Sequence, residues 1–175
     1  MMVKQFTIWL SALILGINNS YGRRFDLKCV TSCTSSDVDS VARVVFGESR
    51  GEAYRGQLAV AYSVVNRVKH QAYPNTIQDV LSATWGNGKH HEYETLDLPG
   101  HDMAWVKAKR ENNDEYLYAL IAAKEAICAC AADPTRCAVS FCAGNGCIKD
   151  NQWYIATNRM TIGNHHFACR VPANG

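Results

Sequence analysis

Residues 41–68 constrain the fold more than any other stretch, because two apolar helical patterns meet there across a short charged turn. In the first pattern, over 38–45, valines recur every three to four residues, as they do on the buried face of a helix. The second pattern, over about 54–69, is apolar almost all round, which is typical of a central, buried helix. The sequence therefore predicts a helical core organised around the turn FGESRGE, residues 46–52.

Glu48 lies in this turn, one helical turn beyond the first apolar pattern, so a carboxyl group stands where the pattern predicts core. Gly47 and Gly51 flank it, and their backbone freedom leads us to expect that the helix ends or bends here, with Glu48 on a cleft wall. Desolvation disfavours the charged form of such a carboxyl group, which can then serve as a general acid near neutral pH. The alternative is a structural glutamate that pairs with Arg43 or Arg50, or caps the next helix.

The beginning of the chain has the composition of a secretory signal peptide over residues 1–22: a lysine, a short apolar run and small residues near Gly22. The apolar run is shorter than the roughly 20 residues that a membrane-spanning helix needs, so no stable membrane insertion is expected. We expect an N-terminal arm over 23–35 and a single domain over 36–175, secreted to the extracellular space. Without residues 1–22 the chain has 17 basic and 16 acidic residues, since Lys4 is removed from 18, and this near-neutral charge argues against a nucleic-acid partner.

Eight cysteines follow the predicted signal peptide, and their even number in a secreted chain predicts up to four disulfides. A zinc site is the alternative, but the spacings do not form a paired CxxC set. Cys128 and Cys130 would be about 200° apart on a helix, at roughly 100° per residue, so we expect them to bridge to different elements. We expect neither a metal nor another cofactor.

The remaining segments complete an α+β prediction. Ser36 is expected to cap the first helix, Thr76 a short helix over 77–81, and Asn113 or Asp114 a helix ending near Cys130. Residues 82–112 show no sustained period and are expected to form a long functional loop, with a short helical turn over 103–110. After Cys137, short β-branched and aromatic runs broken by Gly and Asn predict a small antiparallel hairpin or three-stranded sheet.

Three segments together are similar to a known family: VARVVFGESRGEAYRGQLAVAYSVVNRV with the Pro-Asn-Thr that follows it, then DPTRCAVSF, then MTIGNHHFA. They occur in the order found in the cell-wall hydrolase family typified by the bacterial spore-cortex-lytic enzyme SleB. The resemblance implies a lysozyme-like α+β domain with three main helices and a small C-terminal antiparallel sheet. It also implies a peptidoglycan substrate, cleavage between N-acetylmuramic acid and N-acetylglucosamine, and Glu48 as the catalytic acid.

The resemblance leaves two reactions open. In a lytic transglycosylase one glutamate acts as acid and then as base, and a 1,6-anhydro product forms. A muramidase would use a second carboxylate. The candidates for this second carboxylate are Glu52, Glu92, Glu94, Asp97 and Asp102. Glu52 has a structural alternative, because a carboxylate in the first turn of the next helix is favoured by the helix dipole.

Substrate contacts are expected from Glu94, Tyr93, Tyr154 and His165, with His165 supporting the site or packing beneath it. Residues 86–97, GNGKHHEYETLD, depart from the family, so the family's residues in this loop cannot be transferred to this chain. The histidine pairs could indicate a metal hydrolase, but no HExxH helix is present. Two non-enzymatic alternatives are a glycan-binding protein on the same fold and a cysteine-rich structural domain or toxin. A monomer is expected.

Overall fold

The computed structural model describes residues 29, 33–144 and 156–170. The predicted signal peptide over 1–22 and the predicted substrate residue Tyr154 lie outside these residues, as does most of the predicted N-terminal arm.

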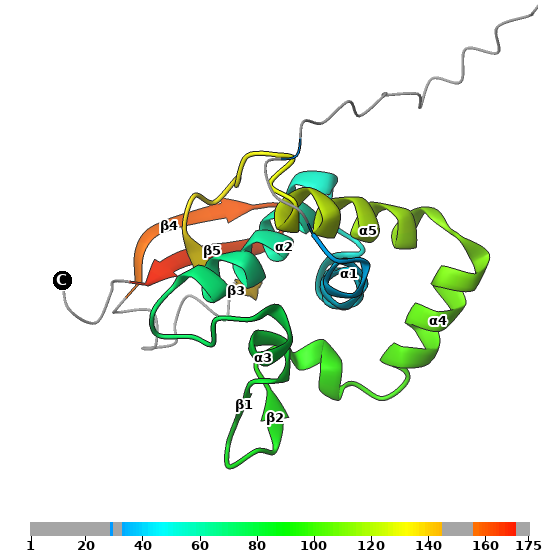
Figure 1. The fold of residues 1–175 in the computed structure, drawn as a ribbon, viewed down its shortest axis with the longest axis horizontal. Coiled ribbons are helices and arrows are strands. Elements are labelled where there is room, and N and C mark those ends of the chain that lie inside the picture. The colour runs from blue at the N-terminus through cyan, green and yellow to red at the C-terminus, as the bar shows by residue number, and fades with distance from the viewer. Residues whose placement is uncertain (1–28, 30–32, 145–155, 171–175) are drawn as a thin grey trace, which may run out of the picture.

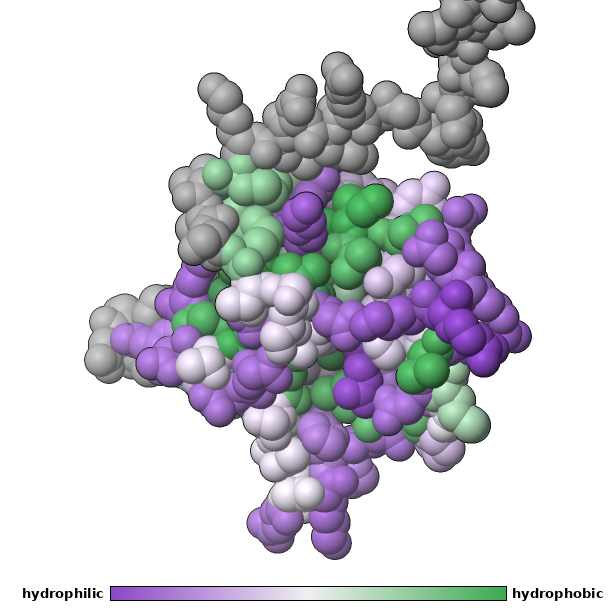
Figure 2. Space-filling model, turned by 45° about the vertical axis from the view of Figure 1, so that its right-hand side comes forward, coloured by the Kyte–Doolittle hydropathy of each residue, from purple (hydrophilic) through white to green (hydrophobic). Residues whose placement is uncertain are grey.

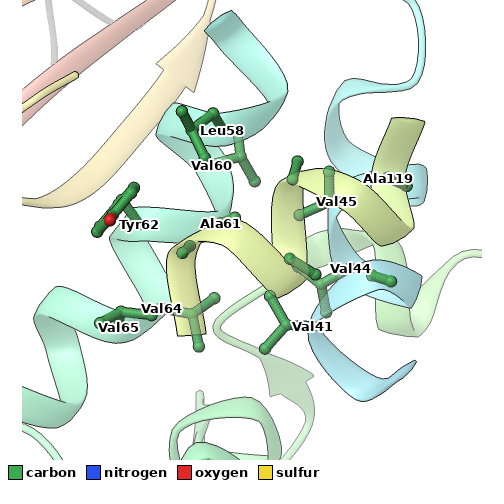
Figure 3. Close-up of a cluster of buried hydrophobic side chains, with 14 of the residues drawn as sticks. Val41, Val44, Val45, Leu58, Val60, Ala61, Tyr62, Val64, Val65 and Ala119 are labelled. Carbon is green, nitrogen blue, oxygen red and sulfur yellow. The ribbon is translucent and has the colours of Figure 1, made fainter. Parts of the chain in front are cut away.

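Three longer helices form the body of the fold: α1 (Ser35–Ser49), α2 (Tyr54–Lys69) and α5 (Asp114–Ile127). Each of the three packs against the other two, and the shorter helices α3 (Ile77–Ser82) and α4 (His101–Glu111) lie beside them (Figure 1). Figure 3 shows apolar side chains of α1 and α2 gathered around α5. The α1 valines at 41, 44 and 45 are fully buried, as are those of α2 at 60 and 64, so the predicted helical core is confirmed.

Side chains at the helix starts satisfy backbone N–H groups that have no partner within the helix. The Thr76 hydroxyl accepts from the Asp79 N–H at 3.1 Å, and the Asn113 carbonyl oxygen accepts from the Tyr116 N–H at 2.9 Å, as predicted. The cap of α1 is Thr34 rather than the predicted Ser36, which lies inside the helix. Helix α5 ends at Ile127, earlier than predicted.

The expected end of the helix in this turn is confirmed, because α1 ends at Ser49, but the role expected of Gly47 and Gly51 is wrong. Helix α1 continues through Gly47 to Ser49, and neither glycine has a positive φ. Backbone freedom is therefore not what either residue supplies. The role of Gly47 is instead a close approach to another segment, which is described with the site below.

The helical turn predicted over 103–110 is confirmed as part of α4, but the rest of residues 82–112 does not form the predicted long loop. The segment contains a hairpin of β1 (Thr84–Trp85) and β2 (His90–His91), the 3₁₀ helix η1 (Glu94–Asp97) and helix α4. The two strands are only two residues long, which is too short to produce a hydrophobic period. Helix α4 buries only His101, Trp105 and Ala108, and its other positions are exposed or partly buried.

The C-terminal sheet matches the prediction of three antiparallel strands. Its order is β3 (Ala138–Ala143), β5 (His165–Arg170), β4 (Ala156–Ile162), so the last strand in sequence lies in the middle. Gly163, with φ +61°, makes the tight turn between β4 and β5. Helix α2 packs against β3, which places the sheet beside the helical core (Figure 1).

Disulfides connect Cys29 with Cys130, Cys33 with Cys128, and Cys137 with Cys169, and Cys142 is disulfide-bonded as well. The expectation that Cys128 and Cys130 bridge to different elements is wrong, because both partners belong to the segment before α1. The helical angle between them does not apply, since α5 ends before them and Ala129 has φ +52°.

Candidate active site

Glu48 lies in the last turn of α1, on the wall of a cavity of about 400 Å³. The cavity forms where α1 and α2 meet the sheet and the segment after β2. Its walls combine ionisable and aromatic side chains, from Glu48, Arg67, Glu92, Tyr93, Glu94, Phe141, Cys142, Ala143 and His165. The helical spacing of the apolar residues in α1 thus places the Glu48 carboxyl group on a cavity wall rather than in the hydrophobic core.

The environment of Glu48 favours its protonated form. Burial is the main cause and raises its pKa above the ordinary value of 4.5, and the nearby Glu94 carboxylate raises it further. Two groups act in the opposite direction: the Thr95 N–H, which donates to Glu48 Oε1 at 2.9 Å, and the Arg67 guanidinium. The net shift is upward, so Glu48 keeps its proton to a higher pH than an exposed glutamate.

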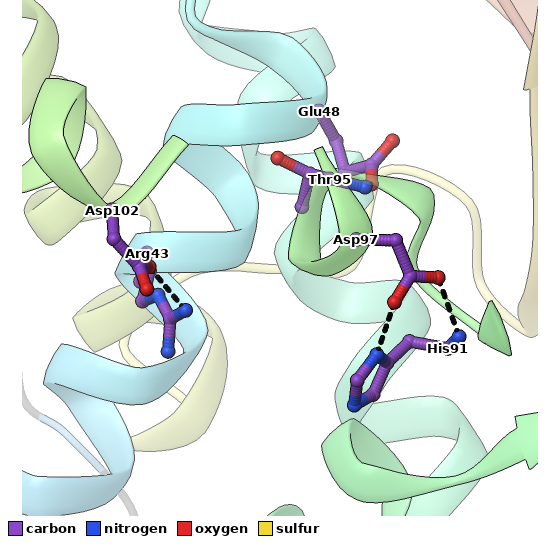
Figure 4. A network of polar contacts seen from close by, with 6 residues as sticks. All are labelled: Arg43, Glu48, His91, Thr95, Asp97 and Asp102. Carbon is purple, nitrogen blue, oxygen red and sulfur yellow. Dashed lines mark hydrogen bonds and ion pairs between the residues drawn. The ribbon is translucent and has the colours of Figure 1, made fainter. Parts of the chain in front are cut away.

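The arginines that could have made Glu48 a structural residue are engaged elsewhere. Arg43 forms an ion pair with Asp102 (Figure 4). Arg50 contacts Phe46, with its guanidinium carbon 5.1 Å from the ring centroid. Within the described part of the chain, no ion pair joins either arginine to Glu48.

Gly47 allows the segment around η1 to reach Glu48. A Cβ on Gly47 would lie 1.7 Å from Thr95 Oγ1 and 2.7 Å from His101 Cε1, so no larger residue fits without movement. Thr95 is buried, and its hydroxyl lies 3.2 Å from Nδ1 of the buried His101. This packing holds the Thr95 N–H against the Glu48 carboxyl group (Figure 4).

Glu52 joins the α1–α2 turn to the β4–β5 turn. Its carboxylate accepts from the backbone N–H of Asn164 at 3.1 Å and from Asn164 Nδ2 at 2.9 Å, and it lies 3.8 Å from His165 Nδ1. Burial acts to raise the pKa of Glu52, but the two Asn164 bonds and His165 outweigh it, and the net pKa is lowered. A Cβ on Gly163 would lie 1.9 Å from Glu52 Oε2, so the turn approaches the carboxylate closely. Glu52 is not part of the cavity wall.

We expect Glu52→Gln to lower the free energy of unfolding at pH 7 by about 2 kcal/mol, because one amide group cannot accept both Asn164 bonds. Since folding lowers the pKa of Glu52, its carboxylate stabilises the protein above the ordinary value of 4.5, and this contribution is lost as pH falls through the folded-state pKa. Urea unfolding should therefore show a larger difference from wild type at pH 7 than at pH 3. The control is Glu111→Gln, on the exposed end of α4, which should stay within about 0.5 kcal/mol of wild type. An equal loss of stability at both pH values would contradict this account.

The predicted substrate residues that the structure describes lie together at the cavity: Glu94, Tyr93 and His165 all line it with Glu48. Tyr93 is buried, which raises its pKa to about 12, so its phenol stays protonated. His165 is also buried, which lowers its pKa and favours the neutral ring. The cavity wall thus combines the neutral groups of Tyr93 and His165 with the Arg67–Glu92 ion pair and the carboxylate of Glu94.

Arg67 is a component of the site that the sequence interpretation missed. It is buried near the end of α2, where its Nε donates to the Val139 carbonyl at 2.7 Å and its guanidinium lies 4.8 Å from the Tyr93 ring. Its Nη1 is 3.4 Å from Glu92 Oε2. The sequence did contain a signal for this residue, which is a positive charge in an otherwise apolar helix. A buried arginine needs hydrogen-bond and charge partners, which indicates a polar site nearby.

Of the other carboxylates considered, Asp97 and Asp102 are absent from the Glu48 cavity wall, whereas Glu92 lines that cavity and pairs with Arg67. Asp102 pairs with Arg43, and Asp97 Oδ1 lies 2.6 Å from His91 Nδ1. Asp97 and Glu92 line a second hollow of about 870 Å³, which shares Glu92, Glu94 and Phe141 with the Glu48 cavity. In the described residues there is no cluster of three or more potential metal ligands, and no helix among them has the length and apolar character to span a membrane.

These features define a lysozyme-like α+β fold. A glutamic acid of raised pKa, at the end of a helix, lines a cavity beside a small antiparallel sheet. The sequence profile of the family described as Cell Wall Hydrolase matches residues 51–168, and the chain belongs to this family. The matched range begins just after Glu48, so the role of that residue rests on its geometry.

Individual relatives agree with the family. Over 48 residues, 27% of this chain, the sequence is 46% identical to the spore cortex-lytic enzyme of Bacillus cereus and 38% identical to that of Bacillus subtilis strain 168. These matches span 18% and 16% of the relatives' lengths. The structure is similar to the catalytic domain of the germination-specific lytic transglycosylase SleB from Bacillus anthracis, with a TM-score of 0.52 and 26% identity over 79% of this chain and 98% of that domain.

Proposed function

We propose that this chain is a peptidoglycan lytic transglycosylase that cleaves the bond between N-acetylmuramic acid and N-acetylglucosamine. The observation that carries the proposal is Glu48, a carboxyl group of raised pKa on a cavity wall, with one backbone N–H fixing its orientation. Membership of the cell wall hydrolase family and the likeness to a lytic transglycosylase domain support the substrate class.

In the proposed reaction, Glu48 acts first as an acid and then as a base. It protonates the glycosidic oxygen as the bond from that oxygen to the muramic acid C1 breaks, and N-acetylglucosamine leaves with the proton. The resulting carboxylate takes the proton of the muramic acid 6-hydroxyl, whose oxygen bonds to C1 and closes a 1,6-anhydro ring. The Thr95 N–H and the Arg67 charge stabilise the carboxylate between the two steps.

A muramidase is the second candidate, and Glu94 is the observation that favours it. Glu94 lines the same cavity as Glu48, whereas Glu52 is engaged by Asn164. In a muramidase Glu94 would activate water or act as the nucleophile. In the transglycosylase its charge instead helps to keep Glu48 protonated.

Mass spectrometry of fragments released from purified peptidoglycan separates these reactions. We expect fragments that end in 1,6-anhydro-N-acetylmuramic acid. Reducing N-acetylmuramic acid ends would assign a muramidase instead. Binding to peptidoglycan with no fragments released would contradict both reactions and leave a glycan-binding protein.

We also propose that the protein is exported, with a signal peptide over 1–22, an arm over 23–35 and one monomeric catalytic domain over 36–175. The disulfides support an oxidising compartment. The intact mass of protein recovered from culture medium tests this proposal, since retention of residues 1–22 would contradict it.

A further inference from the structure

The β1–β2 hairpin projects from the body of the molecule (Figure 1). Thr84 pairs with His91 and Trp85 with His90, and the connection contains Gly86, Asn87 and Gly88, all with positive φ. At the bottom of Figure 2 the visible face of the hairpin is white and purple, so this face shows no broad apolar patch. The turn and the second strand of the hairpin lie within residues 86–97, the segment that departs from the family pattern, and Trp85 directly precedes that segment.

Trp85 presents an open aromatic surface on this hairpin. Its side chain is 58% exposed, and its ring centroid is 4.6 Å from that of His90, at an interplanar angle of 30°. The cross-strand pairing and the ring contact hold the indole on one side and leave the rest of it accessible. A held, exposed indole can stack against the C–H face of a sugar ring at little cost in conformational entropy.

The hairpin is also connected firmly to the catalytic region. The Asp97 carboxylate accepts from the His91 backbone N–H at 2.7 Å and contacts its ring nitrogen at 2.6 Å (Figure 4). Asp97 ends η1, the same short helix whose Thr95 N–H binds Glu48. The position of Trp85 is thus fixed relative to Glu48 through η1.

Trp85 lines the hollow of about 870 Å³ that adjoins the Glu48 cavity through Glu92, Glu94 and Phe141. A continuous glycan strand can therefore contact both. The hollow has three carboxylates and no lysine or arginine in its lining. Two of them, Glu92 and Asp97, have cationic or histidine partners, and Glu94 adds a further negative charge.

From these observations we propose that Trp85 forms a second sugar-binding subsite, which takes a neutral N-acetylglucosamine residue of the glycan strand. The carboxylates of the hollow accept hydrogen bonds from the hydroxyl and amide N–H groups of the sugar. N-acetylglucosamine offers these donors and, unlike muramic acid, carries no lactyl group that a stem peptide extends. The inference rests on the proposed glycan-cleaving function and adds a residue that binds a sugar of the strand beyond the cleaved bond.

The test is calorimetric binding of N-acetylglucosamine tetramer to the full chain carrying Glu48→Gln, which prevents cleavage. Adding Trp85→Ala should weaken binding about tenfold, and Trp85→Phe by less, because a smaller ring remains. The matched control is Tyr118→Ala, since Tyr118 is 42% exposed on α5 and lines neither hollow. This control should leave the affinity unchanged.

Unchanged affinity in Trp85→Ala, or no binding of the tetramer by Glu48→Gln, would overturn the subsite. The proposed function is read separately, from wild-type protein on peptidoglycan: anhydro products with unchanged tetramer binding would retain the reaction and reject the subsite. With Glu48 intact, Trp85→Ala should raise KM on long glycan strands and leave kcat unchanged, because Trp85 binds the strand and not the reacting bond.

Discussion

Glu48→Gln is expected to reduce the release of peptidoglycan fragments by at least about a thousandfold. The amide can still accept the Thr95 N–H, so the local structure is retained while the proton that the leaving oxygen needs is absent. In the proposed mechanism the same residue later takes the proton of the 6-hydroxyl, so one substitution removes both steps. Fragment release over time, followed by chromatography, measures the effect.

Asp102→Asn is the matched control, because Asp102 is exposed and pairs with Arg43 on α1, outside the cavity wall. It should retain wild-type release. Equal release by wild type and Glu48→Gln would remove Glu48 from the mechanism.

Although Glu48→Gln should lower activity, we expect it to raise the stability of the folded protein. Folding raises the pKa of Glu48, so its ionisation opposes the folded state: the penalty is absent below the ordinary value of 4.5 and is complete above the folded-state pKa. Glu48→Gln should therefore be more stable than wild type at neutral pH and equal to it near pH 3. A catalytic carboxyl group often destabilises the fold that holds it, so its replacement is expected to give an inactive but more stable variant.

The helical core and the position of Glu48 could be predicted from sequence because both depend on local periodicity. The valines of α1 recur at helical spacing, and Glu48 continues their row by one turn. The helix caps at Thr76 and Asn113 were also local signals and were predicted correctly. The three-stranded sheet followed from the turn residues and β-branched runs that bound its strands.

The rest of the site depends on contacts between segments distant in sequence, which no local pattern records. The Thr95 N–H binds Glu48 across 47 residues, and Arg67 reaches the Val139 carbonyl across 72. The two-residue strands of the hairpin carry no period. Gly47 was noticed in the sequence but given the wrong role, because its neighbours, Thr95 and His101, become close only in the folded chain.

Gly47→Ala should consequently have a large effect on both stability and activity. Its new methyl group would lie 1.7 Å from Thr95 Oγ1 and 2.6 Å from Thr95 Cβ, so η1 must move away from α1. Overpacking of this kind costs about 2 kcal/mol of unfolding free energy. The movement also withdraws the Thr95 N–H from Glu48, and misplacement near the reacting group should reduce fragment release about a hundredfold. Urea unfolding and the release assay measure the two effects.

Gly51→Ala separates this packing effect from any general effect of adding a methyl group in the turn. Gly51 has no positive φ, and a Cβ there meets nothing within 4 Å, so the change should stay within about 0.5 kcal/mol of wild type. Thr95→Gly removes two of the three atoms that crowd Gly47, so in a double-mutant cycle it should offset at least about 1 kcal/mol of the Gly47→Ala loss. Additive losses in that cycle would show that Gly47 and Thr95 do not act through direct contact. The expected coupling arises because η1 can lie close enough to α1 to bind Glu48 only where α1 has no side chain.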